Sequence, residues 1–91
     1  MELILQANNR LPDICGSPVR WFTVDRSVDA VDATIAGDWH VFLGASIPFD
    51  TQGERLSLVL KEKVGGRKNE LEYVDLRYNE RIFFRYRQDA P

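Results

Sequence analysis

Two side chains of this sequence could support nucleophilic catalysis, and each residue type occurs once: Cys15 and His40. A histidine that takes up the proton of a thiol makes it a thiolate nucleophile, and a third group normally orients that histidine. The sequence suggests no third group. We therefore interpret His40 as a histidine within a strand and Cys15 as an inert cysteine in a loop. A single cysteine also excludes an internal disulfide, and its presence does not indicate a cellular compartment.

Four aspartates at short intervals form a candidate cation site: Asp25, Asp29, Asp32 and Asp38. Their spacing does not match a calcium-binding loop, so we expect these carboxylates to lie in solvated turns. The sequence also lacks a glycine-rich phosphate loop and the cysteine and histidine spacing typical of zinc sites. It thus predicts no catalytic residue, no metal site and no cofactor. The chain is not expected to be an enzyme, and an unrecognised small hydrolase is the least favoured alternative.

Aromatic and arginine side chains near the carboxyl end are stronger candidates, for a function in binding. We predict that five of them contact a partner: Arg77, Tyr78, Phe83, Arg85 and Tyr86. Rigid aromatic rings and arginines often dominate the energetics of protein interfaces. The plainer alternative is that these side chains only pack in the core or across neighbouring strands.

Four arginines, at positions 77, 81, 85 and 87, could instead form a basic face for an acidic partner or a nucleic acid. Such residues often only keep an exposed strand soluble. No aromatic RNA-binding signature accompanies them. The net charge of −2 gives no general attraction to nucleic acid or anionic lipid. We expect no nucleic-acid partner, but a stand-alone soluble α+β module that binds a ligand or nucleic acid through this face stays open as an alternative.

These candidate residues are predicted to lie on a hairpin spanning residues 71–87. Aromatic and β-branched residues dominate segments 71–78 and 82–87, and the polar segment 79–81 is the expected tight turn. Because this hairpin ends the sequence, we expect its last strand to be a sheet edge that can pair with a partner. Alternation predicts an apolar face with Val74, Leu76, Tyr78, Ile82, Phe84 and Tyr86, and an aromatic and basic face with Tyr73, Asp75, Arg77, Phe83, Arg85 and Arg87.

The first third of the sequence predicts strands and loops. Residues 2–7 are expected to form a short strand and residues 11–18, with two prolines and a glycine, a loop. Residues 19–26 carry apolar groups on both faces, which predicts a strand covered on two sides. A hairpin follows, with strands at 30–36 and 38–44 around Gly37-Asp38, and with Trp39, Val41 and Leu43 on one face.

One helix is expected, over about residues 52–64. Thr51 and Glu54 have the spacing of a capping box, and Gly65-Gly66 supplies the stop. The segment 67–70 is then a solvated loop. The apolar stripe of the helix consists of Leu56, Val59, Leu60 and Val64, and Leu58 widens it.

The 91 residues, 44% of them hydrophobic and 29% charged, indicate one ordinary globular domain. The order of elements predicts an α+β fold: a mostly antiparallel sheet of about five to six strands, one amphipathic helix on one face, and a carboxyl-terminal β-hairpin. No apolar run has the roughly 18 residues that a membrane span needs. The first residues do not resemble a secretory signal either.

Several short motifs occur here in a characteristic order. They are Trp-His-Val-Phe-Leu-Gly at 39–44, a helix with Arg55-Leu56 near its start, and Tyr-Val-Asp-Leu-Arg-Tyr at 73–78. Leu-Pro-Asp-Ile-Cys-Gly at 11–16 is similar to a loop that precedes such motifs. Over residues 38–87 the chain resembles the carboxyl-terminal part of the extracytoplasmic β domain of FtsQ/DivIB, a family of bacterial cell-division proteins. Family members usually have a cytoplasmic tail, a transmembrane helix, a POTRA domain and an extra helical stretch, so the chain resembles a truncated or shortened β domain.

The resemblance implies a docking function in septum assembly and no enzymatic activity. In that family the β domain lies outside the cytoplasmic membrane and holds the FtsB–FtsL pair, which adds a strand beside the last strands of the domain. Arg77 and Tyr78 match the end of the Asp-Leu-Arg-Tyr motif that contributes to this contact. Tyr86 lies where an aromatic residue of the final strand also contributes. Residues 79–81 differ from the glycine-containing turn common in the family.

Overall fold

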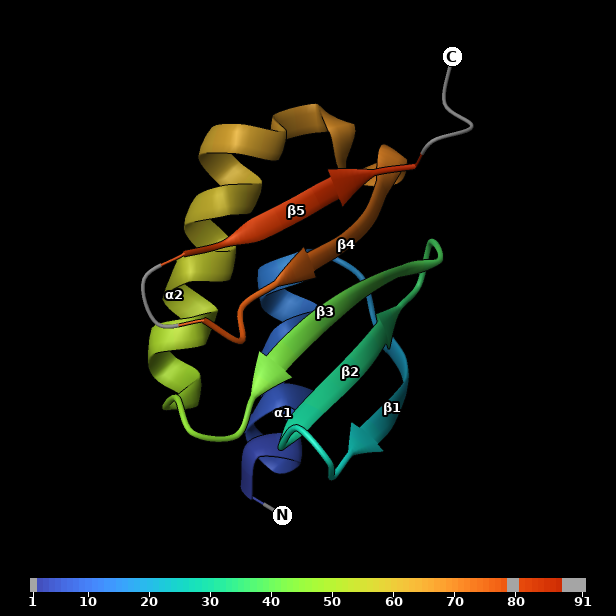
Figure 1. Ribbon diagram of the computed structural model, residues 1–91. Coiled ribbons are helices and arrows are strands. Elements are labelled where there is room, and N and C mark those ends of the chain that lie inside the picture. Colours follow the sequence, from blue (N-terminus) through green and yellow to red (C-terminus); the bar gives the residue numbers. More distant parts are fainter. Residues whose placement is uncertain (1, 79–80, 88–91) are drawn as a thin grey trace.

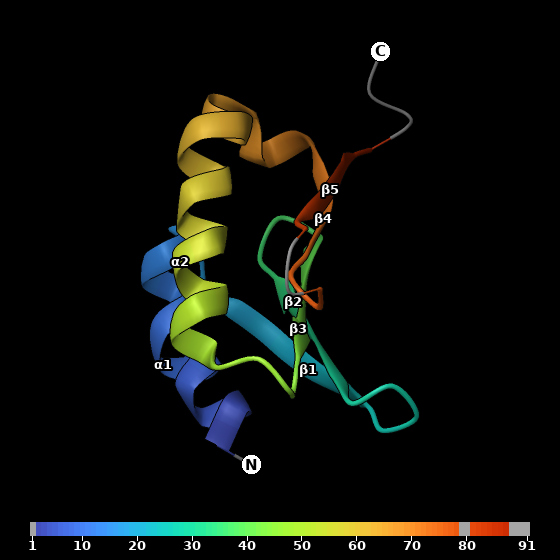
Figure 2. The ribbon, with the colours of Figure 1, turned by 60° about the vertical axis from the view of Figure 1, so that its left-hand side comes forward.

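The fold is a single twisted sheet with both helices on one of its faces (Figures 1 and 2). The computed structural model describes residues 2–78 and 81–87. The five strands lie in the order β1-β2-β3-β4-β5, and all neighbours are antiparallel except β3 and β4. The predicted α+β fold with a mostly antiparallel sheet is confirmed. The elements are α1 (Glu2–Cys15), β1 (Val19–Asp25), β2 (Ala30–Ile35), β3 (Trp39–Gly44), α2 (Phe49–Val59), η1 (Leu60–Val64), η2 (Gly65–Glu70), β4 (Leu71–Asp75) and β5 (Phe83–Tyr86).

Helix α1 replaces the strand that we predicted for residues 2–7 and the first part of the loop that we predicted for residues 11–18, whereas residues 16–18 lie outside any helix or strand. Three fully buried side chains, Ala7, Leu11 and Cys15, recur every four residues and form the stripe that α1 packs against the core. Pro12 lies inside the helix, where it removes one hydrogen-bond donor. The helix still forms because burial of the stripe outweighs this local cost.

The β2–β3 hairpin forms as predicted. Gly37 and Asp38 have φ angles of 101° and 66°, which the tight connection requires. Trp39, Val41 and Leu43 are buried on the helix side of the sheet. Strand β1 pairs only with β2 among the described strands. None of its side chains is fully buried, so the expectation that both of its faces are covered is wrong. It is an edge strand with mostly exposed side chains.

Helix α2 begins at Phe49, three residues earlier than predicted. Pro48 is the N-cap and no side chain caps the helix, so Thr51 and Glu54 do not form the predicted capping box. The predicted stripe of Leu56, Val59, Leu60 and Val64 is buried, whereas Leu58 is 53% exposed and does not widen it. The helix continues through the π-helical segment η1, and the segment predicted as a loop at 67–70 belongs to the 3-10 segment η2.

Gln52 fixes the junction between the sheet and α2. Its side chain is fully buried, and its Oε1 accepts the N–H of Gly44 at 2.8 Å. Its Nε2 donates to the carbonyls of Gly44 at 2.9 Å and Ile47 at 2.7 Å. One side chain therefore satisfies three backbone groups where β3 ends, and α2 then carries the chain over the sheet to the parallel strand β4.

Strands β4 and β5 form the predicted antiparallel pair, but the link between them is longer than a tight turn. Strand β4 ends at Asp75 and β5 begins at Phe83. Residues 79 and 80 of the predicted turn lie outside the described residues. Leu76 still donates its N–H to the carbonyl of Phe42 at 2.9 Å, which holds the start of the link beside β3.

Candidate functional site

Strand β5 lies at the carboxyl-terminal edge of the sheet and, in the described part of the chain, pairs only with β4 (Figure 1). The N–H of Arg87 donates to the carbonyl of Glu70 at 2.8 Å, on the β4 side. Backbone groups of successive residues in a strand point to alternate sides. The N–H and C=O groups of Phe84 and Tyr86 therefore point away from β4, toward the free side of the edge.

Three of the five predicted partner-binding residues lie together at one end of this edge. The rings of Tyr78 and Phe83 meet edge to face, with centroids 5.5 Å apart. The guanidinium carbon of Arg77 lies 5.8 Å from the centroid of the Tyr78 ring. Tyr78 is 49% exposed and Phe83 is 45% exposed, so both rings present apolar surface to solvent. The prediction that Tyr78 belongs to the apolar, buried face is wrong, because β4 has ended before this residue.

Arg77 and the main chain of Tyr78 are held in place. Asp75, which is 5% exposed, accepts from Nε of Arg77 at 2.9 Å and from one Nη at 2.7 Å. This hydrogen bonding raises the pKa of Arg77 above its ordinary value, and the negative charge of Asp75 adds to the effect. The carbonyl of Tyr78 accepts from Arg55 of α2 at 3.0 Å. The exposed ring of Tyr78 is thus carried by a backbone that the helix supports.

The other two predicted residues lie apart from that cluster. Arg85 is opposite Tyr73 in the register and faces Glu72, with its Nε 3.8 Å from a carboxylate oxygen. Tyr86 packs partly against the core, and the guanidinium of Arg67 lies 3.9 Å from the centroid of its ring. Its neighbour Phe84 is also partly buried. The side chain of Tyr86 therefore packs mainly within the domain and leaves little of its surface for contact with a partner.

The sheet face opposite the helices, called the open face below, is not the basic face that we predicted. Arg77 and Arg85 lie near carboxylates, and Arg87 donates to the carbonyl of Gly37. Arg81 is exposed in the link between the strands. The same face carries aspartates on β1, β2 and β4, so its charge is mixed. Of the aromatic residues predicted for this face, Tyr73 lies 5.4 Å from Phe42 between ring centroids. Phe42 and His40, whose ring centroids are 6.0 Å apart, extend this row of rings onto β3, which the prediction did not include.

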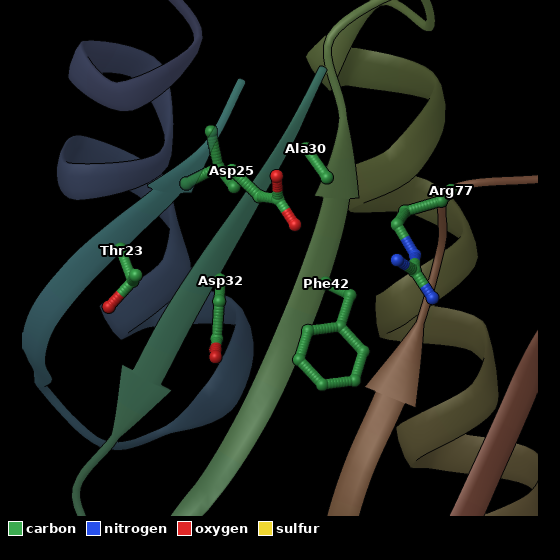
Figure 3. A pocket seen from close by; sticks show the side chains of 7 residues that line it. Thr23, Asp25, Ala30, Asp32, Phe42 and Arg77 are labelled. Atoms are coloured by element: carbon green, nitrogen blue, oxygen red, sulfur yellow. The ribbon is translucent and has the colours of Figure 1, made fainter. Parts of the chain in front are cut away.

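A pocket of about 200 Å³ lies on the open face near the ends of β1, β2 and β3. Figure 3 shows the carboxylate of Asp25 and the guanidinium of Arg77 on opposite sides of Ala30, with the ring of Phe42 of β3 below them in the view. The full lining is Thr23, Asp25, Ala30, Val31, Asp32, Phe42 and Arg77. Sequence reasoning missed this site, since its residues belong to β1, β2, β3 and the segment after β4. Only the alternation of Thr23 with Asp25 and of Ala30 with Asp32 indicated which side chains share a face.

The aspartates that we expected in solvated turns have different environments. Asp29 and Asp38 lie in turns with positive φ angles. The carboxylate of Asp25 accepts from the N–H and the hydroxyl of Ser27, at 3.1 and 2.6 Å, and these hydrogen bonds lower the pKa of Asp25. Asp32 lies within strand β2 and contacts Nδ1 of His40 at 2.9 Å. No group of three or more metal-ligating side chains gathers within residues 2–78 and 81–87.

His40 and Cys15 lie on opposite faces of the sheet and cannot act together. His40 is on the open face, where its Nδ1 also lies 3.3 Å from the hydroxyl of Thr34. Cys15 is fully buried at the end of α1, so the prediction of a loop cysteine is wrong. Burial raises the pKa of the Cys15 thiol to about 12, although the nearby ammonium of Lys68 acts in the opposite direction. A thiol with this pKa holds its proton at neutral pH and is a poor nucleophile.

Among the residues that the structure describes, no helix is long and apolar enough to cross a membrane. A comparison with models of known protein families finds no match for this chain, and a comparison with curated proteins finds none either.

Proposed function

We propose that this chain is a non-enzymatic protein-interaction domain that binds an extended segment of a partner along strand β5. The free side of β5, next to the exposed rings of Tyr78 and Phe83, is the observation that carries the proposal. By resemblance to FtsQ/DivIB, the setting is bacterial septum assembly on the extracytoplasmic side of the cytoplasmic membrane. The partners are proteins of the FtsB and FtsL type.

In strand addition the backbone supplies most of the affinity, and the side chains supply most of the selectivity. The N–H and C=O groups of Phe84 and Tyr86 would pair with the partner backbone, which gives affinity with little dependence on sequence. Alternate partner side chains would meet the open face, where Tyr78 and Phe83 offer apolar surface and Arg77 offers charge. Because β5 has only four residues, these side-chain contacts must supply much of the selectivity.

Amide hydrogen exchange tests the backbone part of the proposal. In the free protein, the amides of Phe83 and Arg85 point toward β4 and should exchange slowly, whereas those of Phe84 and Tyr86 should exchange fast. A peptide from the strand-forming region of an FtsB-type protein should slow exchange at Phe84 and Tyr86 specifically. Exchange rates at these two amides that stay unchanged with saturating peptide would refute strand addition at β5.

Side-chain variants test the aromatic cluster. Tyr78→Ala and Phe83→Ala should each weaken peptide binding by roughly tenfold or more, as expected for exposed aromatic anchors. Trp21→Ala is the matched control, because Trp21 is 55% exposed on β1 at the opposite edge of the sheet. Equal effects of Tyr78→Ala and Trp21→Ala would show that the peptide does not recognise the β5 edge.

The alternative was a stand-alone module that binds a ligand or nucleic acid through an arginine-rich face. We do not propose it, because the charge of the open face is mixed and not basic. Salt-dependent binding of the domain to nucleic acid of arbitrary sequence would instead support the nucleic-acid-binding alternative.

A further inference from the structure

The pocket on the open face exists because small residues separate two charged ones. Ala30 of β2 lies opposite Asp25 on one side and opposite Gly44 on the other. A Cβ atom on Gly44 would lie 3.3 Å from the Cα atom of Arg77, so the backbone of Arg77 runs directly beside this glycine. Along the row of neighbouring residues from Asp25 to Arg77 there are therefore only the methyl group of Ala30 and a hydrogen atom of Gly44. The gap they leave is the pocket of about 200 Å³.

The charged groups around this gap are fixed by neighbours outside it. Ser27 holds the carboxylate of Asp25 through two hydrogen bonds, at 3.1 and 2.6 Å. Asp75 holds Arg77 through Nε and one Nη, which leaves the other Nη group available as a donor. Strands β1 and β4 are three inter-strand spacings apart, about 14 Å between backbones. Asp25 and Arg77 thus face one another across the pocket without forming an ion pair with each other.

The distribution of charged side chains around the pocket indicates which class of ligand it can bind. Asp25 and Asp32 line one side of the pocket, Arg77 lines the other, and the ring of Phe42 lies between them (Figure 3). An ammonium group beside two carboxylates and an aromatic ring gains from Coulomb attraction and from a cation–π contact. A carboxylate gains only at the Arg77 end, where the remaining guanidinium donors can reach it. A lone anion would be repelled by the two aspartates, and a lone cation would leave Arg77 unused.

We propose that this pocket binds a small zwitterion, that is, one molecule carrying both an ammonium and a carboxylate group, of the amino-acid class. The ammonium lies between Asp25 and Asp32, the carboxylate meets Arg77, and the carbon chain lies over Ala30 and Phe42. The pocket shares only Arg77 with the contacts proposed along β5, and its other lining residues belong to β1, β2 and β3. Failure of partner binding at β5 would therefore leave this inference standing, and failure of zwitterion binding would leave the proposal for β5 standing.

A titration followed by two-dimensional NMR tests this assignment. Glycine, β-alanine and γ-aminobutyrate form a series in which the separation between the two charges increases. At least one of them should shift the amide signals of Ala30 and Phe42 in a saturable way. It should bind roughly tenfold more tightly than methylammonium or acetate, which each carry only one of its charges. Methylammonium binding as tightly as every zwitterion would overturn the proposal, as would the absence of saturable shifts for all three zwitterions.

Two variants and a control locate the site. Asp25→Asn removes the carboxylate at an exposed position and should weaken zwitterion binding by roughly tenfold. Ala30→Val fills the gap and should abolish binding. Asp13→Asn removes one exposed carboxylate from α1, on the other side of the sheet, and should leave binding unchanged. If Ala30→Val does not fold, Asp25→Asn decides alone: undiminished binding in this variant refutes the proposed site.

Discussion

Replacing Gln52 with methionine should strongly destabilise the fold, although the two side chains have similar length and volume. The substitution removes three hydrogen bonds, to the N–H and C=O groups of Gly44 and to the carbonyl of Ile47, all in the buried junction between β3 and α2. Each buried backbone group left without a partner costs about 1–3 kcal/mol. The apolar methionine regains part of this loss because it is easier to bury than an amide. We expect a net loss of about 2–4 kcal/mol in the free energy of unfolding.

Urea denaturation followed by circular dichroism measures this change. A domain of this size has a total stability of about 5–15 kcal/mol, so the variant should show a clearly lower midpoint with an unchanged slope. Gln52→Glu provides a second test. Its carboxylate cannot donate to the two carbonyls at neutral pH, and burial raises the pKa of such a group. The folded state then binds a proton more readily than the unfolded state, so the stability of this variant should improve as the pH falls.

Thr51→Ala is the matched control, one residue away in the same helical turn. If Thr51 capped α2, its loss would cost about 1 kcal/mol. In the structure the helix begins at Phe49 and no side chain caps it, so the loss should stay below about 0.5 kcal/mol. A loss below about 1 kcal/mol for Gln52→Met would refute the reasoning, as would a Thr51→Ala loss of equal size.

Three further outcomes follow from the buried and charged groups. Leu56→Ala should cost about 2–5 kcal/mol, whereas Leu58→Ala, at a position 53% exposed, should have little effect in the same denaturation assay. Because the pKa of Cys15 rises from 9.0 to about 12 on folding, the folded state keeps a proton that the unfolded state loses. Stability should therefore decline as the pH rises from 9 toward 12, less so in Cys15→Ala, and a folded thiol that reacts with Ellman's reagent at the rate of the urea-unfolded chain would contradict its burial. Ser27→Ala should raise the pKa of Asp25, measured by NMR titration, part of the way toward its ordinary value. The variant loses the hydroxyl hydrogen bond, which is the largest cause of the lowered pKa, but keeps the backbone N–H bond.

The elements that the sequence predicted well are those whose pairing or packing is local. The β2–β3 hairpin follows from alternating residues around Gly37-Asp38, where positive φ angles are needed. The apolar stripe of α2 and η1 follows from the spacing of Leu56, Val59, Leu60 and Val64, all of them buried. In both cases the residues that decide the structure lie within a few positions of one another, so periodicity alone indicates them.

The predictions that were wrong concern choices between local alternatives of similar free energy. Residues 2–15 contain a β-like run and a proline, but they form α1 because Ala7, Leu11 and Cys15 can be buried together only on a helix. The start of α2 moved from Gln52 to Phe49 because Gln52 and Phe49 are both buried at the end of β3, where they anchor the first turn. Local capping signals are worth only about 1 kcal/mol and yield to such packing.

In the candidate sites too, some features follow from the local sequence and others only from the tertiary structure. The sequence by itself determined the alternation that places Phe83 and Arg85 on one face of the last strand. It also named Tyr78 as a candidate contact, but it placed this residue on the apolar face, and only the structure shows its ring to be exposed. Only the tertiary structure decided that β4 pairs in parallel with β3, which brings Arg77 across the sheet from Asp25. The physical reason is that side-chain direction along one strand is fixed by the backbone, whereas the order of strands depends on which faces the helices can cover together.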